Sequence, residues 1–423
     1  MKNDTTVIPL RQPKSFDDPL TELAREGARR MLATALTAEA DAFVASFDAD
    51  RLPDGRQRIV RHGLGPERQI QTGIGAIEVR RPKVRDRGLE EDGAGKVRFT
   101  SNILPKWARR SRRLDALLPV LYLRGISTGD FQEALSALLG PDAPNLSPNV
   151  ISRLNAGWGM DYDAWQRRDL SARRYVYIWA DGVYLQARME PQAECMLVII
   201  GATPEGKKEL LGFQVGVRES AQSWRELLVD IKGRGLKIAP ELAVGDGGLG
   251  FWKAIDQVFP GTRHQRCWVH KTANVLNKFP KPMAAAIKSD LQDIHHAATR
   301  AEAQTALRQF EEKYGTKYEK AVACLTKDAT ALLAFYDFPA EHWDHLRTSN
   351  PIESVFATVR HRTMRTKGAL SQKTARLMVF TLIQAAAKSW RRLNGRNQLP
   401  KVIEGIKFTN GVEVTDAAET SAA

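Results

Sequence analysis

The chain has 423 residues, 43% of them hydrophobic, and a formal net charge of +14, enough length for roughly two or three domains with real cores. Its three cysteines are widely spaced and no run of about 18 apolar residues occurs, which excludes a disulfide-built fold and a membrane-spanning helix. The polar N-terminus lacks an apolar segment of signal-peptide length, so we expect a soluble cytoplasmic protein.

The positive charge is concentrated in two blocks. Residues 51–124 hold 18 Lys and Arg against 8 Asp and Glu, and residues 347–407 hold 13 against 2. The rest of the chain is therefore net acidic. Because a solvated surface usually mixes its signs, this separation favours a nucleic acid partner over an ordinary charged surface.

The N-terminal part is predicted to begin with a disordered stretch, residues 1–18. Residues 19–47 have helical periodicity and end before a segment rich in turn residues. Residues 56–87 then predict a short β-hairpin whose strands end in Arg and Lys. An acidic, glycine-rich loop follows.

Three successive helical segments are predicted next, over 107–125, 127–140 and 147–158. Ser147 would cap the third helix and Pro148 would take its first position. This order is typical of a helix-turn-helix, but a plain three-helix packing unit has the same pattern. In a helix-turn-helix, the third helix would present four polar side chains to a DNA groove, those of Asn149, Ser152, Arg153 and Asn155.

The middle of the chain predicts an α/β layer. Its segments in order are strands at 174–188, 194–203 and 207–216, a helix at 219–236, a strand at 239–247, a helix at 248–259 and a short strand at 262–270. Three strands followed by helix, strand, helix and strand indicate a mixed five-stranded sheet. Residues 272–345 are then predicted to be almost entirely helical.

Two acids stand out in this layer. Asp181 lies within the apolar strand IWADGVY, where a charge is costly unless it is paired or binds a metal. Asp246 follows the strand LAVG, at the carboxyl end where α/β folds build their sites. Each acid alone is explained at least as well by a turn, since Asp-Gly is a hairpin signal. Together, in a basic surround, they favour Mg²⁺ or Mn²⁺.

A third acid, Glu353, stands alone in the basic stretch LRTSNPIESVFATVRHRTMRTKG. Asn350 and Pro351 place it in the first turn of a helix, where an acid suits the helix dipole. As a third carboxylate it would complete a site for two cations about 4 Å apart. Basic residues later in the stretch would hold phosphates; these are Arg360, His361, Arg362, Arg365 and Lys367.

In combination, these segments resemble the Mutator-type transposases of bacterial insertion sequences. The matching pieces include SPNVISRL, IWADGVYLQAR, VGDGGLGFWKAI, CWVHKTANVL and RTSNPIES, within residues 50–395. The resemblance implies a ribonuclease-H-like core with an Asp-Asp-Glu metal triad, here Asp181, Asp246 and Glu353. The helical residues 272–345 lie where the family has an insertion between the second Asp and the Glu.

The same resemblance implies a function. A transposase of this type would bind the terminal inverted repeats of its element as a homodimer or higher oligomer. It would cleave DNA and transfer strands to target DNA with two Mg²⁺ or Mn²⁺ ions, and it would be associated with the nucleoid. Two other functions remain open. A DNA-binding regulator needs the basic blocks but not the acids, and a structure-specific nuclease needs the acids but no long sequence-reading half.

Two details concern individual residues. Many relatives have Asp-Ala-His at the second acid, whereas this chain has Asp-Gly-Gly and so no histidine beside Asp246. Cys267 and His270 match a Cys-x-x-His element of the family. A structural zinc site would need a second pair of ligands, which is not found nearby. We therefore expect Cys267 and His270, with Asn350, to support the active site or to approach DNA.

The predicted domains follow from these segments. They are a flexible N-terminus and helix (1–50), a basic hairpin-containing DNA-binding segment (51–105), a helix-turn-helix domain (106–170), the first part of the core (171–271), the helical insertion (272–345), the C-terminal helices of the core with Glu353 (346–407) and a disordered tail (408–423).

Overall fold

The computed structural model describes residues 19–88, 96–111, 121, 135, 148–185, 194–216, 218–365 and 372–414. Within 148–154 and 361–365 the description is confined to the backbone. The chain divides into two compact units, Met1–Ile151 and Ser152–Ala423, and each is described by itself.

The first unit packs helix α1 (Pro19–Ala45) against a hairpin of β1 (Ile59–Thr72) and β2 (Gly75–Asp86). Its small apolar core consists of Leu36, Ile70, Ile77, Val79 and Leu104. The predicted helix is confirmed, but the hairpin is longer than predicted, with strands of 14 and 12 residues. Register shifts around Leu64 absorb the residues Gly63 to Pro66, which look like strand breakers in the sequence.

The predicted helix-turn-helix lies mostly outside the described residues. The first predicted helix was expected to start at Trp107, but its described residues 107–111 are not helical, because Ser111 N donates to Gln71 O and Gln71 N donates to Arg109 O. Helix α4 (Pro148–Gln166) does begin at Pro148. In the second unit its later turns pack Tyr162 edge-on against Phe380.

The second unit is built on a mixed five-stranded sheet. Its strands are β3 (Tyr177–Leu185), β4 (Glu194–Ala202), β5 (Lys208–Gly216), β6 (Leu242–Gly245) and β7 (Arg263–Arg266). Their order across the sheet is β5-β4-β3-β6-β7; β3, β4 and β5 pair antiparallel, and β6 and β7 continue parallel to β3. This arrangement, predicted from the strand pattern, fits a ribonuclease-H-like core.

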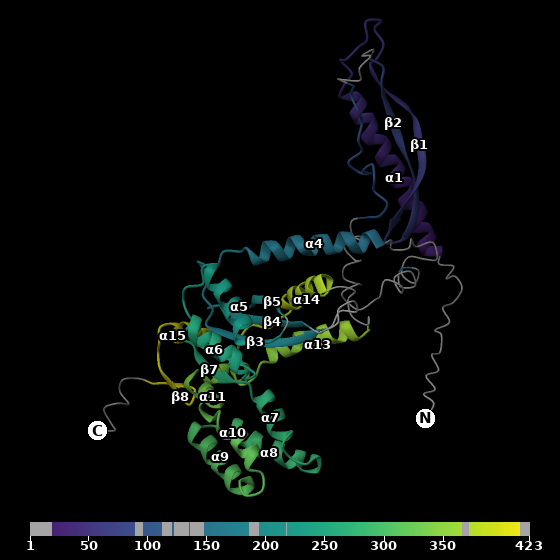
Figure 1. The fold of residues 1–423 in the computed structure, drawn as a ribbon. Coiled ribbons are helices and arrows are strands. Elements are labelled where there is room, and N and C mark those ends of the chain that lie inside the picture. Colours follow the sequence, from purple (N-terminus) through teal and green to yellow (C-terminus); the bar gives the residue numbers. More distant parts are fainter. Residues whose placement is uncertain are drawn as a thin grey trace, which may run out of the picture. The chain divides into compact units, whose positions relative to one another are not determined.

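One face of the sheet is covered by α5 (Ala221–Gly233) and α6 (Leu249–Val258) (Figure 1). On β3 this face presents Ile178 and Ala180. Both belong to one buried cluster with helix residues that include Trp224, Leu227, Leu228, Ile231, Phe251, Ala254 and Ile255. Burial of each large side chain of this kind stabilises the fold by about 1.5–3 kcal/mol.

The opposite face of β3 presents Tyr177 and Trp179, because alternate strand residues point to opposite sides. The Tyr177 hydroxyl contacts His342 Nδ1 at 2.8 Å, and Trp179 Nε1 donates to the carbonyl oxygen of His345 at 2.9 Å. These contacts fix helix α12 (Trp343–Leu346) on this face. They therefore fix the start of the chain segment that leads to Glu353.

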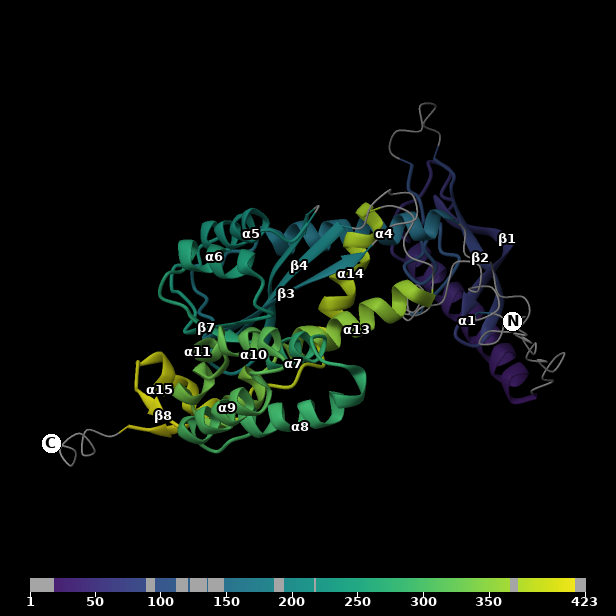
Figure 2. The ribbon, with the colours of Figure 1, turned by 60° about the horizontal axis from the view of Figure 1, so that its bottom comes forward.

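A group of helices follows β7 and lies beside it in both views (Figure 2). These elements are α7 (Trp268–Leu276), η1 (Lys281–Met283), α8 (Ala284–His295), α9 (Arg300–Tyr314), α10 (Glu319–Thr326), α11 (Ala329–Leu332), η2 (Ala334–Asp337) and η3 (Ala340–His342). The C-terminal elements are α13 (Asn350–Arg365), α14 (Gln372–Ala387), η4 (Arg396–Gln398), α15 (Leu399–Ile403), β8 (Phe408–Thr409) and β9 (Val412–Glu413).

Two segments differ from the sequence prediction. The strand expected to run to His270 ends at Arg266. The backbone N–H of Cys267 still donates to Gly245 O, but Cys267 already takes the N-cap position of α7, and the chain continues as a helix. Residues 408–414, expected in the disordered tail, include a short hairpin. Its turn has Asn410 at φ 50° and Gly411 at φ 80°, and Asn-Gly is the preferred pair for such a turn. Within the described residues, no helix combines the length and apolarity needed to cross a bilayer.

Candidate active site

Asp181 and Asp246 follow equivalent positions on adjacent parallel strands. The pairs that join β3 to β6 end at Ala180 opposite Gly245. The next residue along each strand is the aspartate, so the two side chains leave the sheet side by side on the same face. The register thus brings together the two acids that the sequence singles out.

Cys267 extends this row onto β7. The pairs between β6 and β7 end at Gly245 opposite Arg266, and Cys267 N donates to Gly245 O at 2.8 Å. Cys267 is fully buried at the start of α7. Asp181, Asp246 and Cys267 therefore line the carboxyl ends of three neighbouring parallel strands, where α/β folds place their sites.

Glu353 reaches this row from α13, whose first turn it occupies as predicted. Ser349 precedes the helix and accepts the backbone N–H of Glu353 at 3.1 Å. The Ser349 hydroxyl lies 2.9 Å from Glu353 Oε1 and donates to it. One serine therefore satisfies an N–H of the first helical turn and fixes the direction of the carboxylate.

Three groups converge on Glu353 Oε1. Cys267 Sγ lies 3.8 Å away and His270 Nδ1 3.9 Å away, in addition to the Ser349 hydroxyl. Cys267 Sγ in turn accepts the backbone N–H of Ser349 at 3.3 Å and lies at the same distance from the Ser349 hydroxyl oxygen. Since the contacts of the described side chains fall on Oε1, Oε2 is the oxygen left to face a ligand.

The supporting residues are placed unevenly. Cys267 and His270 contact Glu353, whereas Asn350 has an exposed side chain and contacts Thr348 only through its backbone N–H. Ser349, which the sequence analysis does not single out, makes the contact expected nearby. A serine directly before a helix start that contains Pro351 is an N-cap signal and could have identified it.

Asp181 is held in an environment that resists its charge. The residue is 9% exposed, and burial raises the pKa of its carboxyl to about 7, with Asp246 and Glu219 adding to the rise. His270 and the N–H of Gly182, which donates to Oδ1 at 2.8 Å, oppose that rise. In the described part of the chain, no Lys or Arg forms an ion pair with Asp181 or Asp246.

His270 is the positive group of the site. Its contact with Cys267 raises the pKa of the imidazole to about 9, with further contributions from Asp181 and Glu353 and against the effect of burial. At neutral pH the side chain is therefore a cation among carboxylates. It compensates part of their charge without reaching hydrogen-bond distance of Glu353.

A fourth carboxylate, Glu219, faces the same place and is missed by the sequence analysis. A methyl group added at Gly248 would lie 3.3 Å from Asp246 Oδ1 and 3.5 Å from Glu219 Oε1. Trp224 Nε1 donates to Glu219 Oε1 at 2.9 Å and fixes the side chain. Burial raises the pKa of this carboxyl, and Asp246 adds to the rise.

Two glycines make room for Glu219. A Cβ at Gly250 would lie 2.8 Å from the backbone N of Ala221, so its absence lets the starts of α5 and α6 approach closely. A Cβ at Gly182 would lie 3.1 Å from Glu219 Oε2. Glu219 follows the edge strand β5, and only the packing of α5 on α6 carries it to Asp246; no local sequence pattern shows this.

The comparisons with known proteins identify the family of this chain. A family model described as "Transposase, Mutator family" matches residues 5–392. The chain belongs to the Mutator family of transposases. The resemblance seen in the sequence is therefore confirmed.

Two known transposases are about half identical to this chain over the aligned residues. The transposase for insertion sequence element IS6120 of Mycolicibacterium smegmatis is 48% identical over 298 residues, or 70% of this chain and 92% of that protein. The transposase for insertion sequence element IST2 of Acidithiobacillus ferrooxidans is 50% identical over 288 residues, 66% and 95%. A solved structure of the simian T-cell lymphotropic virus intasome in complex with PP2A regulatory subunit B56 gamma matches 38% of this chain and 49% of that one, with 15% identity and a TM-score of 0.18.

The donor set of this transposase-family chain suits a hard divalent cation. Asp181, Asp246, Glu219 and Glu353 offer only carboxylate oxygens, the ligands that Mg²⁺ and Mn²⁺ prefer. The buried carboxyl of Asp181 has no basic ion-pair partner among the described residues, so a cation would remove the cost of its charge.

A second combination of ligands is also present. One ligand atom each from Cys267, His270 and Glu353 lie within 4.8 Å of one another. Zinc in a structural site requires four ligands, and the described residues supply three here. Because Ser349 already donates its backbone N–H to Cys267 and its hydroxyl to Glu353, this cluster fits better as a support that orients Glu353.

The predicted DNA-binding residues are only partly described. The side chains of Asn149, Ser152 and Arg153 on α4 lie outside the described residues, as do those of His361, Arg362 and Arg365 on α13 and all of Lys367. Asn155 is half-buried on α4 and Arg360 is exposed on α13. Both helices exist where they were expected.

Proposed function

We propose that this chain is an Asp-Asp-Glu transposase that binds the terminal inverted repeats of an insertion sequence, cleaves DNA and transfers strands with Mg²⁺ or Mn²⁺. The observation that carries the proposal is the register of β3 against β6. It sets Asp181 beside Asp246 on the sheet face from which α13 presents Glu353. Three carboxylates from distant parts of the chain converge with His270 as their positive neighbour and with no Lys or Arg ion pair among the described residues.

Asp181, Asp246 and Glu353 would hold the cations, most simply two. Bound there, divalent cations activate an oxygen nucleophile and neutralise charge on the phosphate. Water adds to phosphorus and loses a proton, and the 3′-oxygen of the cleaved strand leaves as a hydroxyl. In the second reaction that hydroxyl oxygen bonds to phosphorus of the target strand, whose own 3′-oxygen leaves. No protein nucleophile is needed, since phosphoryl transfer is mostly positioning and charge stabilisation.

Other residues of the chain position these carboxylates. Ser349 directs Glu353 by its hydrogen bond to Oε1, and Trp224 directs Glu219 in the same way. His270 is protonated at neutral pH. Its positive charge offsets part of the repulsion between the carboxylates of Asp181 and Glu353.

DNA would be held by the basic blocks. Lys83 and Arg85 on β2 and Arg87 just beyond its end alternate along the chain, so they share one face, and all three are exposed. This row on the hairpin would contact phosphates without reading bases, while the start of α4 would read the repeats. Residues after Glu353 on α13 would hold the phosphates next to the cleaved bond.

The test uses Asp181→Asn and Glu353→Gln with a duplex that carries the repeats flanking the gene. Both variants should bind this duplex in a gel shift as the unmodified protein does, and Mg²⁺-dependent cleavage should fall by at least about 10³-fold. Mn²⁺ affinity, measured by calorimetry without DNA, should fall in parallel and gives a readout independent of activity. Asp344→Asn, a change at an exposed acid of α12, is the matched control.

The outcome also separates the two other functions. A variant that cleaves at the unmodified rate refutes the triad. Binding to the repeats with no metal-dependent cleavage by the unmodified protein would instead show a DNA-binding regulator. Cleavage of duplexes or RNA–DNA hybrids without regard to the terminal repeats would show a structure-specific nuclease.

A further inference from the structure

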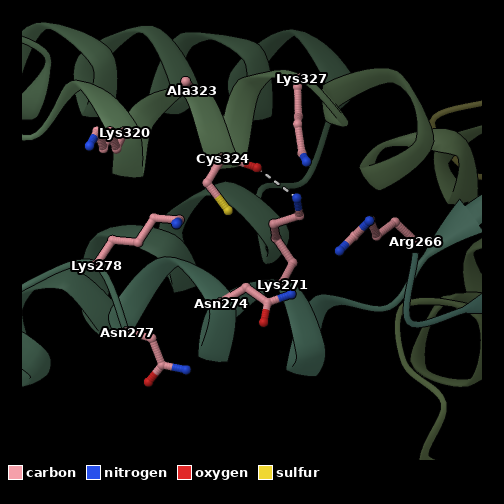
Figure 3. Close-up of a pocket in the computed structure, with 9 residues that line it drawn as sticks. All are labelled: Arg266, Lys271, Asn274, Asn277, Lys278, Lys320, Ala323, Cys324 and Lys327. Atoms are coloured by element: carbon pink, nitrogen blue, oxygen red, sulfur yellow. Dashed lines mark hydrogen bonds between the residues drawn. The ribbon is translucent and has the colours of Figure 1, made fainter. Parts of the chain in front are cut away.

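A basic cavity of about 600 Å³ lies between α7 and α10 (Figure 3). Its lining residues are Arg266, Lys271, Asn274, Asn277, Lys278, Lys320, Ala323, Cys324 and Lys327. Five of the nine carry a positive charge and none carries a negative one. Figure 3 shows Lys278 and Lys327 reaching into the space between the two helices, toward Lys271.

Only part of this charge is used by the fold. Lys271 is fully buried; it donates to the carbonyl oxygen of Cys324 at 2.6 Å and pairs with Asp328. Asp328 also pairs with Arg266 at 3.0 Å. One carboxylate therefore serves the two cations at the base of the cavity.

The remaining three lysines are exposed and point to no acid. Lys278, Lys320 and Lys327 form no ion pair with a described residue. Clustered like charges repel, and a surface without a ligand usually intersperses acids among them. The cavity is thus complementary to an anion that carries several charges.

We propose that this cavity binds the phosphodiester backbone of the DNA whose cleavage was proposed above, a few nucleotides from the reacting phosphate. The inference rests on that proposed function and assigns a part of the DNA path to α7 and α10. Lysines are suited to this role because they are compact charges on flexible stems, which follow a backbone without reading its sequence.

The position of the cavity favours a strand over a small polyphosphate. Helix α7 contributes His270 to the candidate active site and Lys271 and Asn274 to the cavity. From His270 to Leu276, where α7 ends, the helix axis rises by about 9 Å, and Lys278 lies two residues beyond that end. Charges on one DNA strand repeat every 3.4 Å or so, which makes the helical part of this span about three nucleotides. A strand held at His270 would therefore reach the cavity.

Cys324 gives a direct probe. Of the three cysteines, Cys195 and Cys267 are fully buried and Cys324, in the cavity lining, is partly exposed. Burial also raises the pKa of Cys195 to about 12, which leaves it protonated and unreactive. A thiol reagent such as N-ethylmaleimide should label Cys324 of the full chain, and saturating DNA should slow that labelling at least about tenfold if a backbone fills the cavity.

Charge variants give an independent measurement. In the triple variant Lys278→Gln, Lys320→Gln, Lys327→Gln, the slope of log affinity against log salt should fall by about 0.9 for each phosphate that the lysines no longer neutralise. The matched control is Lys237→Gln, Lys288→Gln, Lys317→Gln, which changes the net charge equally at exposed lysines outside the cavity. The control should keep nearly the full slope, and both variants should keep the Mn²⁺ affinity.

Each other outcome overturns the proposal. If DNA binds and is cleaved but Cys324 is labelled at an unchanged rate, or if the slope falls equally in the two triple variants, the cavity is not on the DNA path. Protection by pyrophosphate and not by DNA would assign it to a small polyphosphate. If the unmodified protein binds no DNA at all, the proposed function fails and this inference fails with it.

Discussion

The two ends of α7 lie in opposite electrostatic environments. At its start, Cys267 and His270 contact Glu353, one of a group of carboxylates that pair with no Lys or Arg among the described residues. From Lys271 onward, α7 and Lys278 just beyond its end line a cavity whose lysines pair with no acid except Asp328. Nothing in the stability of the fold requires either cluster, since unpaired like charges destabilise both.

The difference is informative because one ligand satisfies both clusters. Divalent cations neutralise the carboxylates, and a DNA strand that reaches from those cations to the lysines neutralises the cavity. Lys271 lies at the boundary between the two clusters. It follows His270 directly, is fully buried, and forms an ion pair with Asp328. The two ends should therefore respond to different ligands, and variants should be able to separate them.

We call the carboxylates near the start of α7 the acidic end and the lysines of the cavity the lysine end. The largest effect is expected when the acidic end loses one of its proposed metal ligands. Asp246→Asn should reduce cleavage by at least about 10³-fold and weaken Mn²⁺ binding, with DNA affinity retained, because the side chain meets the cation rather than phosphate. Lys278→Gln should do the opposite, lowering DNA affinity while Mn²⁺ binding is unchanged. Calorimetry measures the Mn²⁺ affinity of each variant, and a gel shift measures its DNA affinity. A loss of Mn²⁺ affinity in both variants would show that the ends are one site.

Without bound metal, the acidic end should also lower the free energy of unfolding. Burial raises the pKa of Asp181 from 3.8 to about 7, so the folded protein binds that proton more tightly than the unfolded chain. The cost of the charge is absent below about pH 4, grows as pH rises through 7 and amounts to at most about 4 kcal/mol. With chelator present, Asp181→Asn should therefore raise the free energy of unfolding at pH 8 and change it little at pH 4.5.

Thermal unfolding at the two pH values measures this stabilisation. The exposed Asp344→Asn should show no such dependence, and Lys278→Gln should show none either. Addition of Mg²⁺ should cancel the advantage of Asp181→Asn, since the cation compensates the charge in the unmodified protein. Equal melting temperatures for Asp181→Asn and the unmodified protein at pH 8 without metal would contradict the environment described for this carboxyl.

A smaller effect is expected at Glu219, which sharpens the limits of the acidic end. Glu219→Gln keeps an acceptor for Trp224 Nε1 but removes a charge beside Asp246. Mn²⁺ affinity should fall by about 10–100-fold, as for groups that support metal ligands. Glu226→Gln, at an exposed acid on the helix α5 that follows Glu219, is the control and should leave the affinity unchanged. An unchanged affinity for Glu219→Gln would restrict the site to the triad.

Much of the second unit could be predicted from its sequence because its strands are short, apolar and separated by clear breaks. Residues 194–203 were predicted as a strand and β4 is Glu194–Ala202. The failures have local causes. The strand before α7 ends at Arg266 because its neighbour β6 ends at Gly245, a fact of pairing that no single segment contains. The hairpin at 408–414 has an Asn-Gly signal, but strands of two residues carry almost no periodicity.

The residues of the candidate site also fall into two groups, those that a local sequence pattern indicates and those that only the packing of distant elements brings together. Asp181 and Glu353 could be selected because one is an acid in an apolar strand and the other an acid alone in a basic helix, and Asp246 because it directly follows a predicted strand. Ser349 and Glu219 stand out in no such way: a serine before a helix and an acid in front of one are ordinary helix-start residues. Their roles depend on which elements pack together, which is tertiary information.

Ser349 offers the finest test, because it acts on the acidic end only through Glu353 and Cys267. Ser349→Ala removes the hydroxyl that holds Glu353 Oε1 and leaves the backbone cap of α13 in place. One such hydrogen bond to a charged group is worth about 1.5–3 kcal/mol, so kcat should fall by roughly 10–100-fold. KM for DNA should hardly change, since the lysine end is untouched. Ser354→Ala, one turn further on α13, is the control. A purely structural serine would lower the melting temperature without separating kcat from KM, whereas a positioning serine lowers kcat in a protein that still unfolds at nearly the same temperature.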